Sequence, residues 1–226
     1  MWAEPSGAVR VSEDRFAPTP PFGSTRRGGT LSDSPLRDRL RAVTSEDHAA
    51  LDAMVAGWRI ETSLGYGAFL SASAAGLAPL EVALERAGVA DWLPDWPKRA
   101  RRAALVSDLT ALGLEPPPFA TTTIPSQAFG VGVLYVLEGS RLGARFLSRQ
   151  VRAGGAGLPL VYLTHGEGDD LWRSFLAWLE AIPKVGFRTD EADAGARYGF
   201  QCFSDAFATV APSGGLNVRT GAHVRV

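Results

Sequence analysis

Cysteine and histidine are scarce in this sequence. Cys202 is the single cysteine among 226 residues, and the three histidines are His48, His165 and His223. A disulfide within the chain is therefore excluded, and a zinc site, which takes several Cys or His ligands, is not expected. A di-iron centre in a helical bundle takes Glu-x-x-His motifs on facing helices, whereas Glu46 is only two residues before His48. The Gly-x-Ser-x-Gly motif of serine hydrolases is also missing from the sequence.

An excess of charge of either sign is absent as well. The 23 basic and 24 acidic residues give a net charge of −1. Proteins that bind nucleic acids usually carry a basic excess on one face, so we expect no nucleic-acid partner. One basic cluster stands out, formed by Lys98, Arg99, Arg101 and Arg102. We expect a solvated helix face there, and the alternative is a site for an anionic group of a ligand or partner.

Long apolar runs are not evident in the sequence. No stretch approaches the roughly 20 apolar residues of a membrane span, so we expect no membrane association. Arg26 and Arg27 precede a polar stretch rather than the apolar core of an export signal. The single cysteine, Cys202, fits a reducing compartment and is expected to be a buried, inert thiol. The expected location is the cytoplasm.

The two ends of the chain differ in composition from its middle. Residues 1–34 are rich in Pro, Gly, Ser and Arg and lack a sustained hydrophobic period. Such a segment buries too little apolar surface to offset its ordering entropy, and the end of the chain has the same character. We therefore predict one helical domain over residues 35–211, between a flexible extension at residues 1–34 and a flexible tail at residues 212–226.

Apolar residues in the middle of the chain recur at the three- and four-residue spacing of amphipathic helices. Ser34 and Pro35 form an N-cap followed by proline at the first helical position. Gly88 and Gly113 are placed to end helices, and Pro79 is expected in the first turn of one. The predicted helices cover residues 35–57, 66–73, 77–87, 99–112, 126–151, 169–182 and 189–209, with a short strand or turn at 160–163. The predicted fold class is all-α, an irregular helical bundle.

Four glycines lie inside the predicted helix of residues 126–151, namely Gly130, Gly132, Gly139 and Gly143. Each costs about 0.5–1 kcal/mol relative to alanine in a helix interior, so a compensating role is expected. Gly139 and Gly143 are four residues apart and lie on one face of the helix. The bare backbone there can approach either a neighbouring helix or a flat ligand. The spacing alone favours the helix crossing.

His48 is the one histidine on a predicted helix. It lies at the shoulder of the apolar stripe, roughly 60° beyond Leu51 around the helix axis. A polar boundary residue is the simpler interpretation. The alternative is a single axial ligand for haem iron, because neutral imidazole is a common iron ligand. His165, in a loop, and His223, in the tail, are expected to be exposed and without function.

Two segments of the sequence resemble one family. Residues 132–145, GVLYVLEGSRLGAR, resemble the distal-helix signature of bacterial biliverdin-producing haem oxygenases, in particular the type found beside bacteriophytochromes. Residues 40–52, LRAVTSEDHAALD, resemble the proximal helix of the same family, where the histidine is the haem ligand. The resemblance spans about residues 36–208. Together the two motifs favour the functional interpretation of both His48 and the glycine pair.

The resemblance implies a single haem oxygenase-like helical domain that holds haem between its proximal and distal helices. It implies oxidative cleavage of haem to biliverdin, CO and iron, with haem as both substrate and cofactor. Dioxygen is the oxidant, the electrons come from a reductase or ferredoxin, and a bacteriophytochrome is a possible recipient of biliverdin. The family is thought to deliver the proton through ordered water, while the protein supplies orientation and electrostatics.

The resemblance also assigns roles to residues. His48 is the implied iron ligand, and Gly139, Ser140 and Gly143 are the implied catalytic residues of the distal helix. The implied haem-binding side chains are His48, Tyr135, Arg41, Arg141 and Arg145, with the arginines as candidate partners of the haem propionates.

The sequence departs from the family pattern at two positions of the distal signature. Ala144 stands where the second of two adjacent glycines is usual, and it is expected to narrow the pocket. Arg141 stands where Thr or Ala is commoner, and it either contacts a propionate or faces solvent. Two alternatives to the enzyme therefore stay open. One is a haem-binding carrier or sensor that does not degrade haem, and the other is a helical interaction protein that has lost the cofactor.

Overall fold

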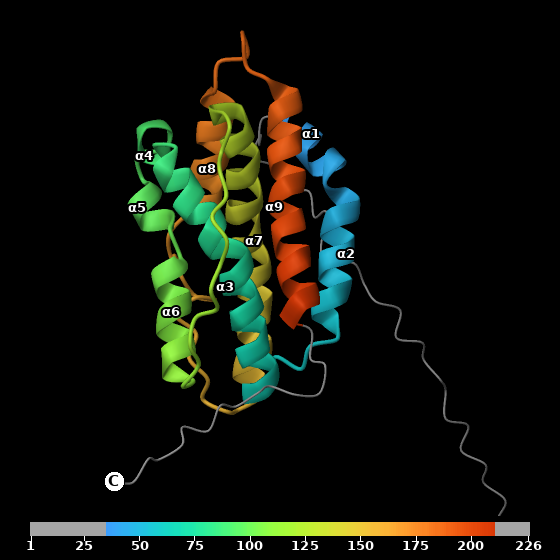
Figure 1. The fold of residues 1–226 in the computed structure, drawn as a ribbon, viewed down its shortest axis with the longest axis vertical. Coiled ribbons are helices and arrows are strands. Elements are labelled where there is room, and N and C mark those ends of the chain that lie inside the picture. The colour runs from blue at the N-terminus through green and yellow to red at the C-terminus, as the bar shows by residue number, and fades with distance from the viewer. Residues whose placement is uncertain (1–34, 211–226) are drawn as a thin grey trace, which may run out of the picture. The chain divides into compact units, whose positions relative to one another are not determined.

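A computed structural model describes residues 35–210, and the predicted extension and tail lie outside these described residues. Within them every regular element is an α-helix and no strand occurs, which confirms the all-α prediction (Figure 1). The helices are α1 (Pro35–Val43), α2 (Ser45–Ala56), α3 (Ser63–Arg86), α4 (Val89–Trp92), α5 (Trp96–Arg99), α6 (Arg102–Ala111), α7 (Gln127–Ala153), α8 (Leu171–Ala181) and α9 (Thr189–Val210).

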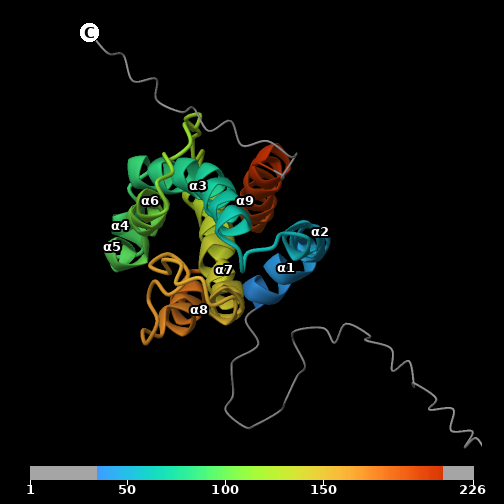
Figure 2. The ribbon, with the colours of Figure 1, turned by 90° about the horizontal axis from the view of Figure 1, so that it is seen from below.

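Helices α3, α7 and α9 form the centre of the bundle. Helix α9 packs against both α7 and α3, and the α1–α2 arm packs against α9 on another side. Helix α6 covers α3 and α8 covers α7, as the end-on view in Figure 2 shows. The helix that carries His48 and the helix that carries the glycines are therefore both supported by α9.

The α7–α9 crossing is close because small residues meet there. A Cβ atom on Gly132 would lie 1.9 Å from the Ala192 carbonyl oxygen, and one on Gly195 would lie 2.0 Å from the Phe129 carbonyl oxygen. Either methyl group would force the two backbones apart. The structure therefore confirms the helix-crossing interpretation for the first part of the glycine series.

The first predicted helix is divided into two. Residues 35–57 were expected to form one helix, but the chain turns at Thr44, between α1 and α2. The Thr44 hydroxyl donates to the Leu40 carbonyl at 2.7 Å, and such a bond competes with the regular backbone ladder. The prediction of a continuous stripe is also wrong, because α2 has no buried residue and Met54 is 36% exposed.

The second and third predicted helices are one helix, α3. Pro79 lies in its interior, not in a first turn. Proline lacks the N–H that the helix needs and normally breaks it, but α3 is buried along most of its length. Its tertiary contacts hold the helix together across the proline.

Helix α3 also corrects the expectation about apolar stretches. By length and composition it is apolar enough to cross a membrane, with a mean hydropathy of 1.4 over 18 residues. However, 83% of that window is buried inside the protein. This location is that of a core helix.

The remaining boundaries agree closely with the predictions. Helix α7 begins at its Ser126 cap, whose hydroxyl accepts from the Phe129 N–H. Gly88 and Gly113 have φ of +79° and +70°, the left-handed conformation that ends helices. The predicted helix of residues 99–112 begins at Arg102, after the separate short α5, and residues 160–163 form turns and no strand. Cys202 is half-buried, not fully buried as predicted, and burial raises the pKa of its thiol.

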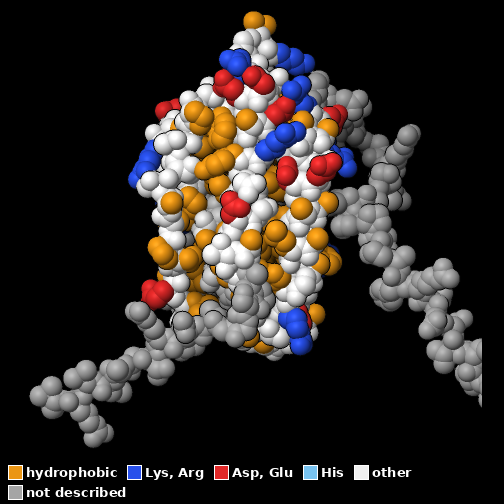
Figure 3. All heavy atoms as spheres, turned by 45° about the vertical axis from the view of Figure 1, so that its right-hand side comes forward, with side chains coloured by type: hydrophobic (Ala, Val, Ile, Leu, Met, Phe, Trp, Pro, Cys, Tyr) orange, Lys and Arg blue, Asp and Glu red, His pale blue; other side chains and the backbone are white. Residues whose placement is uncertain are grey.

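The surface agrees with the even charge balance. On the face drawn in Figure 3, acidic and basic side chains are interspersed towards the upper end, and apolar side chains show in the seams between helices.

Candidate functional site

His48 has one polar partner and a largely open ring. Its side chain is 54% exposed, and its Nδ1 lies 3.0 Å from the Asp52 carboxylate one turn later on α2. One side of the ring meets the edge of Phe200 on α9, with the centroids 5.8 Å apart. A neutral imidazole that donates from Nδ1 to Asp52 keeps its Nε2 lone pair for another partner. Carboxylates orient metal-binding histidines in this way.

The four glycines of α7 fall into two functional pairs. Gly130 and Gly132 pack tightly, since a Cβ atom on Gly130 would lie 2.6 Å from the Trp92 ring. In contrast, a Cβ atom on Gly139 would meet only the Trp172 ring, at 3.9 Å, and one on Gly143 would meet nothing within 4 Å. No helix of the described region therefore covers the bare backbone at Gly143.

Tyr135 lies one turn before Gly139 and connects three elements. Its ring is 6.0 Å from Trp172 of α8. Burial raises the pKa of the Tyr135 phenol, while the positive charges of Arg37 and Arg41 on α1 lower it to a smaller extent. Tyr135 thus packs against α8 and senses the charge of α1, and Arg41 is exposed.

The Ser140 hydroxyl is already engaged. It accepts from Arg101 Nη2 at 2.8 Å and donates to the Leu137 carbonyl at 2.7 Å. The residue thereby fixes the turn of α7 that contains Gly139. It has no hydroxyl proton free for a reacting molecule in this arrangement.

Arg141 neither faces solvent nor offers a free guanidinium to a propionate. It is 8% exposed, and its Nε and Nη2 pair with the Glu138 carboxylate at 3.0 and 2.9 Å. Its remaining contacts go to the Arg99 carbonyl and to His165. The expectation that Arg141 is solvent-exposed is wrong, because Glu138 draws the side chain into the bundle.

The basic cluster of residues 98–102 is only in part the solvated face that was expected. Lys98 is exposed and Arg102 pairs with Glu85 at the surface, whereas the other two arginines are buried. Arg99 and Arg101 are 1% and 2% exposed. Arg99 binds Glu138 at 2.6 Å, and it bridges to Asp95, to Ser174 and to the Leu171 carbonyl. Arg99 does meet an anionic group, as the alternative stated, but that group is the internal carboxylate of Glu138.

Glu138 is the residue that sequence reasoning missed. It lies between Leu137 and Gly139 in the signature, it is 1% exposed, and it pairs with two arginines. A glutamate inside an apolar helical stretch is a signal that it needs a cationic partner. This signal indicates a buried pair without naming which of the 23 basic residues forms it.

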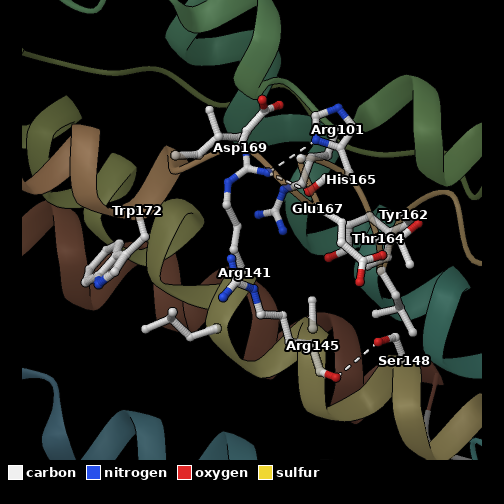
Figure 4. Close-up of a pocket in the computed structure, with 15 residues that line it drawn as sticks. Arg101, Arg141, Arg145, Ser148, Tyr162, Thr164, His165, Glu167, Asp169 and Trp172 are labelled. Carbon is white, nitrogen blue, oxygen red and sulfur yellow. Dashed lines mark hydrogen bonds between the residues drawn. The ribbon is translucent and has the colours of Figure 1, made fainter.

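Arg145 and His165 line a depression beside α7 (Figure 4). Arg145 is exposed there, and Ala144 is buried beneath it. His165 is half-buried and contacts Arg141, so the expectation that it is exposed is wrong. Burial, together with Arg141 and Arg101, lowers the pKa of His165.

The donor set of the described residues fits a single-ligand porphyrin iron better than a chelated ion. No group of three or more His, Cys, Asp or Glu side chains gathers in that part of the chain. Haem brings four nitrogen ligands of its own and needs one protein ligand, flat room and partners for its propionates. His48 supplies the ligand, Gly139 and Gly143 leave the room, and Arg41 is an exposed cation.

Known proteins resemble this chain along most of its length. It is 34% identical over 131 residues to the heme oxygenase of Xanthomonas campestris pv. campestris (strain 8004), a match that covers 54% of this chain and 79% of the relative. It is 31% identical over 180 residues to the heme oxygenase PigA of Pseudomonas aeruginosa, covering 74% of this chain and 88% of the relative. No protein-family profile matches the chain.

Solved structures give the same answer. The NO- and CO-bound heme oxygenase from Neisseria meningitidis matches with a TM-score of 0.66 at 25% identity, over 77% of this chain and 91% of that one. The heme oxygenase from Leptospira interrogans shares the fold, with a TM-score of 0.60 at 19% identity, over 77% and 98% of the two chains. The relatives' identity and coverage, together with this shared fold, show that the chain belongs to the bacterial haem oxygenase family.

Proposed function

We propose that this protein is a haem oxygenase that cleaves haem oxidatively to biliverdin, CO and iron. Haem is both substrate and cofactor, and dioxygen and external electrons are consumed. The observation that carries the proposal is the bare backbone at Gly139 and Gly143, on a bundle that also presents the open imidazole of His48. Haem, when bound, supplies the redox-active iron and the ring that is oxidised.

His48 would hold the haem iron in this proposal. Asp52 accepts a hydrogen bond from the Nδ1–H group and fixes the tautomer, so Nε2 would be the ligating atom. The edge contact with Phe200 limits rotation of the ring. These two contacts orient an otherwise exposed side chain.

The distal helix provides room and a fixed wall. Gly139 and Gly143 keep side chains out of the space above the substrate, and Trp172 borders Gly139 from α8. The phenol of Tyr135 is a potential hydrogen-bond donor, and burial raises its pKa further above the ordinary value. Since Ser140 already donates its hydroxyl proton to Leu137, proton delivery by water is the better fit.

Arg41 is the proposed propionate partner. It is exposed on α1, and its positive charge acts on Tyr135 of the distal helix. Arg145 is not included, because it lines the depression with Arg101 and Ser148, on another side of α7 from Gly139 and Gly143. Arg141 is not included, because its guanidinium serves Glu138. We further propose a cytoplasmic location, an electron-donating reductase or ferredoxin, and a bacteriophytochrome as recipient of biliverdin. These three follow from the family resemblance and the single cysteine, and each is open to direct test.

The test of the activity uses the purified full chain with haemin, a reductase–ferredoxin pair and dioxygen. We expect the haem absorption to give way to that of biliverdin, with release of CO. A stable haem complex that never opens its ring would instead identify a carrier or sensor. Absence of any haem spectrum would leave a helical interaction protein.

A further inference from the structure

Arg101 is a buried cation without a carboxylate for its guanidinium. The side chain is 2% exposed, and its Nη2 donates to the Leu137 carbonyl and to Ser140 Oγ. Glu81 accepts from the backbone N–H of Arg101 instead of the guanidinium. No acceptor among the described residues meets its Nε or Nη1. A buried guanidinium is costly unless charge and hydrogen bonds compensate it.

The guanidinium lines the depression beside α7 together with two other arginines (Figure 4). Arg141 is neutralised by Glu138, a carboxylate that Arg99 also uses. Arg145 forms no salt bridge with a described residue. Two acidic residues, Glu167 and Asp169, also line the depression, and the former pairs with Arg152 at 3.7 Å. The Arg101 guanidinium at the buried end of the depression therefore has no direct salt bridge with a described residue, and Glu81 acts on it only through its charge.

Polar groups on the walls complete a site for an anion. The Tyr162 ring faces the Arg101 guanidinium, with 5.4 Å between Cζ and the ring centroid, and its hydroxyl has no partner in the described region. The hydroxyls of Thr164 and Ser148 donate to backbone carbonyls nearby. The cavity volume at the depression is about 30 Å³, so only a small ligand fits there.

We infer that this depression binds a small oxyanion, carboxylate or phosphate in chemistry, with Arg101 as the buried counter-charge. Charge-assisted hydrogen bonds from Nε and Nη1 are the principal contacts, and Arg145 and the Tyr162 hydroxyl complete the set. The site does not involve His48 or Gly143. It is joined to the distal helix, because the same guanidinium holds the turn that carries Ser140.

Calorimetric titration of the full chain, with and without haemin, tests the site. Inorganic phosphate and sodium formate are the two probes, each at constant ionic strength set with sodium chloride. We expect saturable binding of at least one, and which probe binds decides between a phosphate and a carboxylate. The variant Arg101→Met should weaken binding about tenfold or more, since hydrogen bonds to charged groups are lost.

A matched control and two milder variants keep the result clear. Arg149→Met changes an exposed arginine of α7 that does not line the depression, so the affinity should stay unchanged. If Arg101→Met fails to fold, Arg145→Met and Tyr162→Phe leave the buried contacts intact, and each should weaken binding about threefold. No saturable heat with either probe would overturn the inference. Equal affinities in the parent protein and in every folded variant would also overturn it. Because the haem-free chain is titrated in parallel, either outcome is independent of the proposed enzymatic activity.

Discussion

At the scale of single residues, His48 is exposed, so its role in haem binding can be tested without a large change in the stability of the fold. Its imidazole is 54% exposed, with Asp52 and Phe200 as its neighbours. Surface substitutions away from special features change stability by about 0.5 kcal/mol or less. We predict that His48→Ala retains the parent free energy of unfolding but loses the axial-ligand signature in the haem absorption spectrum.

A substitution at Asp52 should have a smaller effect on haem binding than the loss of His48. Loss of a carboxylate behind a metal-binding histidine typically costs about 10- to 100-fold in affinity or activity. We predict that Asp52→Asn keeps the ligand signature and weakens haem binding within that range, as measured by spectroscopic titration. Identical haem spectra in the parent, His48→Ala and Asp52→Asn proteins would rule out His48 as the ligand.

Glu138, unlike His48, should contribute strongly to stability, because it is buried between Arg99 and Arg141. Removing one partner of a buried ion pair typically costs about 3–5 kcal/mol. We predict a loss of this size for Glu138→Gln in denaturant unfolding. The control is Glu85→Gln, whose salt bridge with Arg102 is exposed on both sides, and such pairs are worth about 1 kcal/mol or less. Equal losses in the two variants would contradict the buried-network interpretation.

At the scale of elements, the glycines of α7 differ in what surrounds them. Gly132 packs closely against α9, whereas Gly143 is open. Gly132→Ala places a methyl group 1.9 Å from the Ala192 carbonyl oxygen of α9. Relief of that overlap requires the two central helices to move apart, so we predict a loss of about 3 kcal/mol or more in the free energy of unfolding.

Gly143→Ala should behave differently on the same helix. Its new methyl group meets nothing within 4 Å, so the alanine should stabilise the helix by about 0.5–1 kcal/mol. The methyl group also projects into the proposed substrate space, so we predict turnover lower by roughly tenfold. Greater stability with undiminished turnover would show that haem does not approach this face.

The elements also show where local patterns suffice. The length of α7, its Ser126 cap and the stops at Gly88 and Gly113 follow from the sequence, because they depend on neighbours along the chain. The continuity of α3 does not follow from the sequence. Pro79 predicts a break in the helix, and only burial against other helices overrides this preference. The turn at Thr44 is equally invisible to periodicity, because apolar spacing continues across it.

At the scale of the whole molecule, His165 makes stability depend on pH. Burial and the charges of Arg141 and Arg101 lower its pKa in the folded protein, whereas an unfolded chain has a histidine pKa of about 6.5. The unfolded state therefore binds a proton before the folded state does. The stabilising contribution is complete above about pH 6.5 and is lost as the pH falls from there through the folded pKa.

This linkage predicts a measurable difference on acidification. The parent protein should lose stability between pH 7 and pH 5 more steeply than His165→Gln, which has no group to protonate at that position. Thermal unfolding midpoints at several pH values check this. A parent slope equal to that of His165→Gln would refute the assignment.

The sequence by itself determined the helical class, the helix α7, the bare stretch at Gly139 and Gly143 and the candidacy of His48, because periodicity, capping and side-chain chemistry are local properties. Only the tertiary structure decided that Gly132 is covered by α9 while Gly143 is open. It alone drew Arg99, Arg101 and Arg141 inward, around Glu138 and the turn of Ser140. Those partners come from helices far apart in the chain, and the spacing of residues along one helix carries no information about which charge on another will meet it.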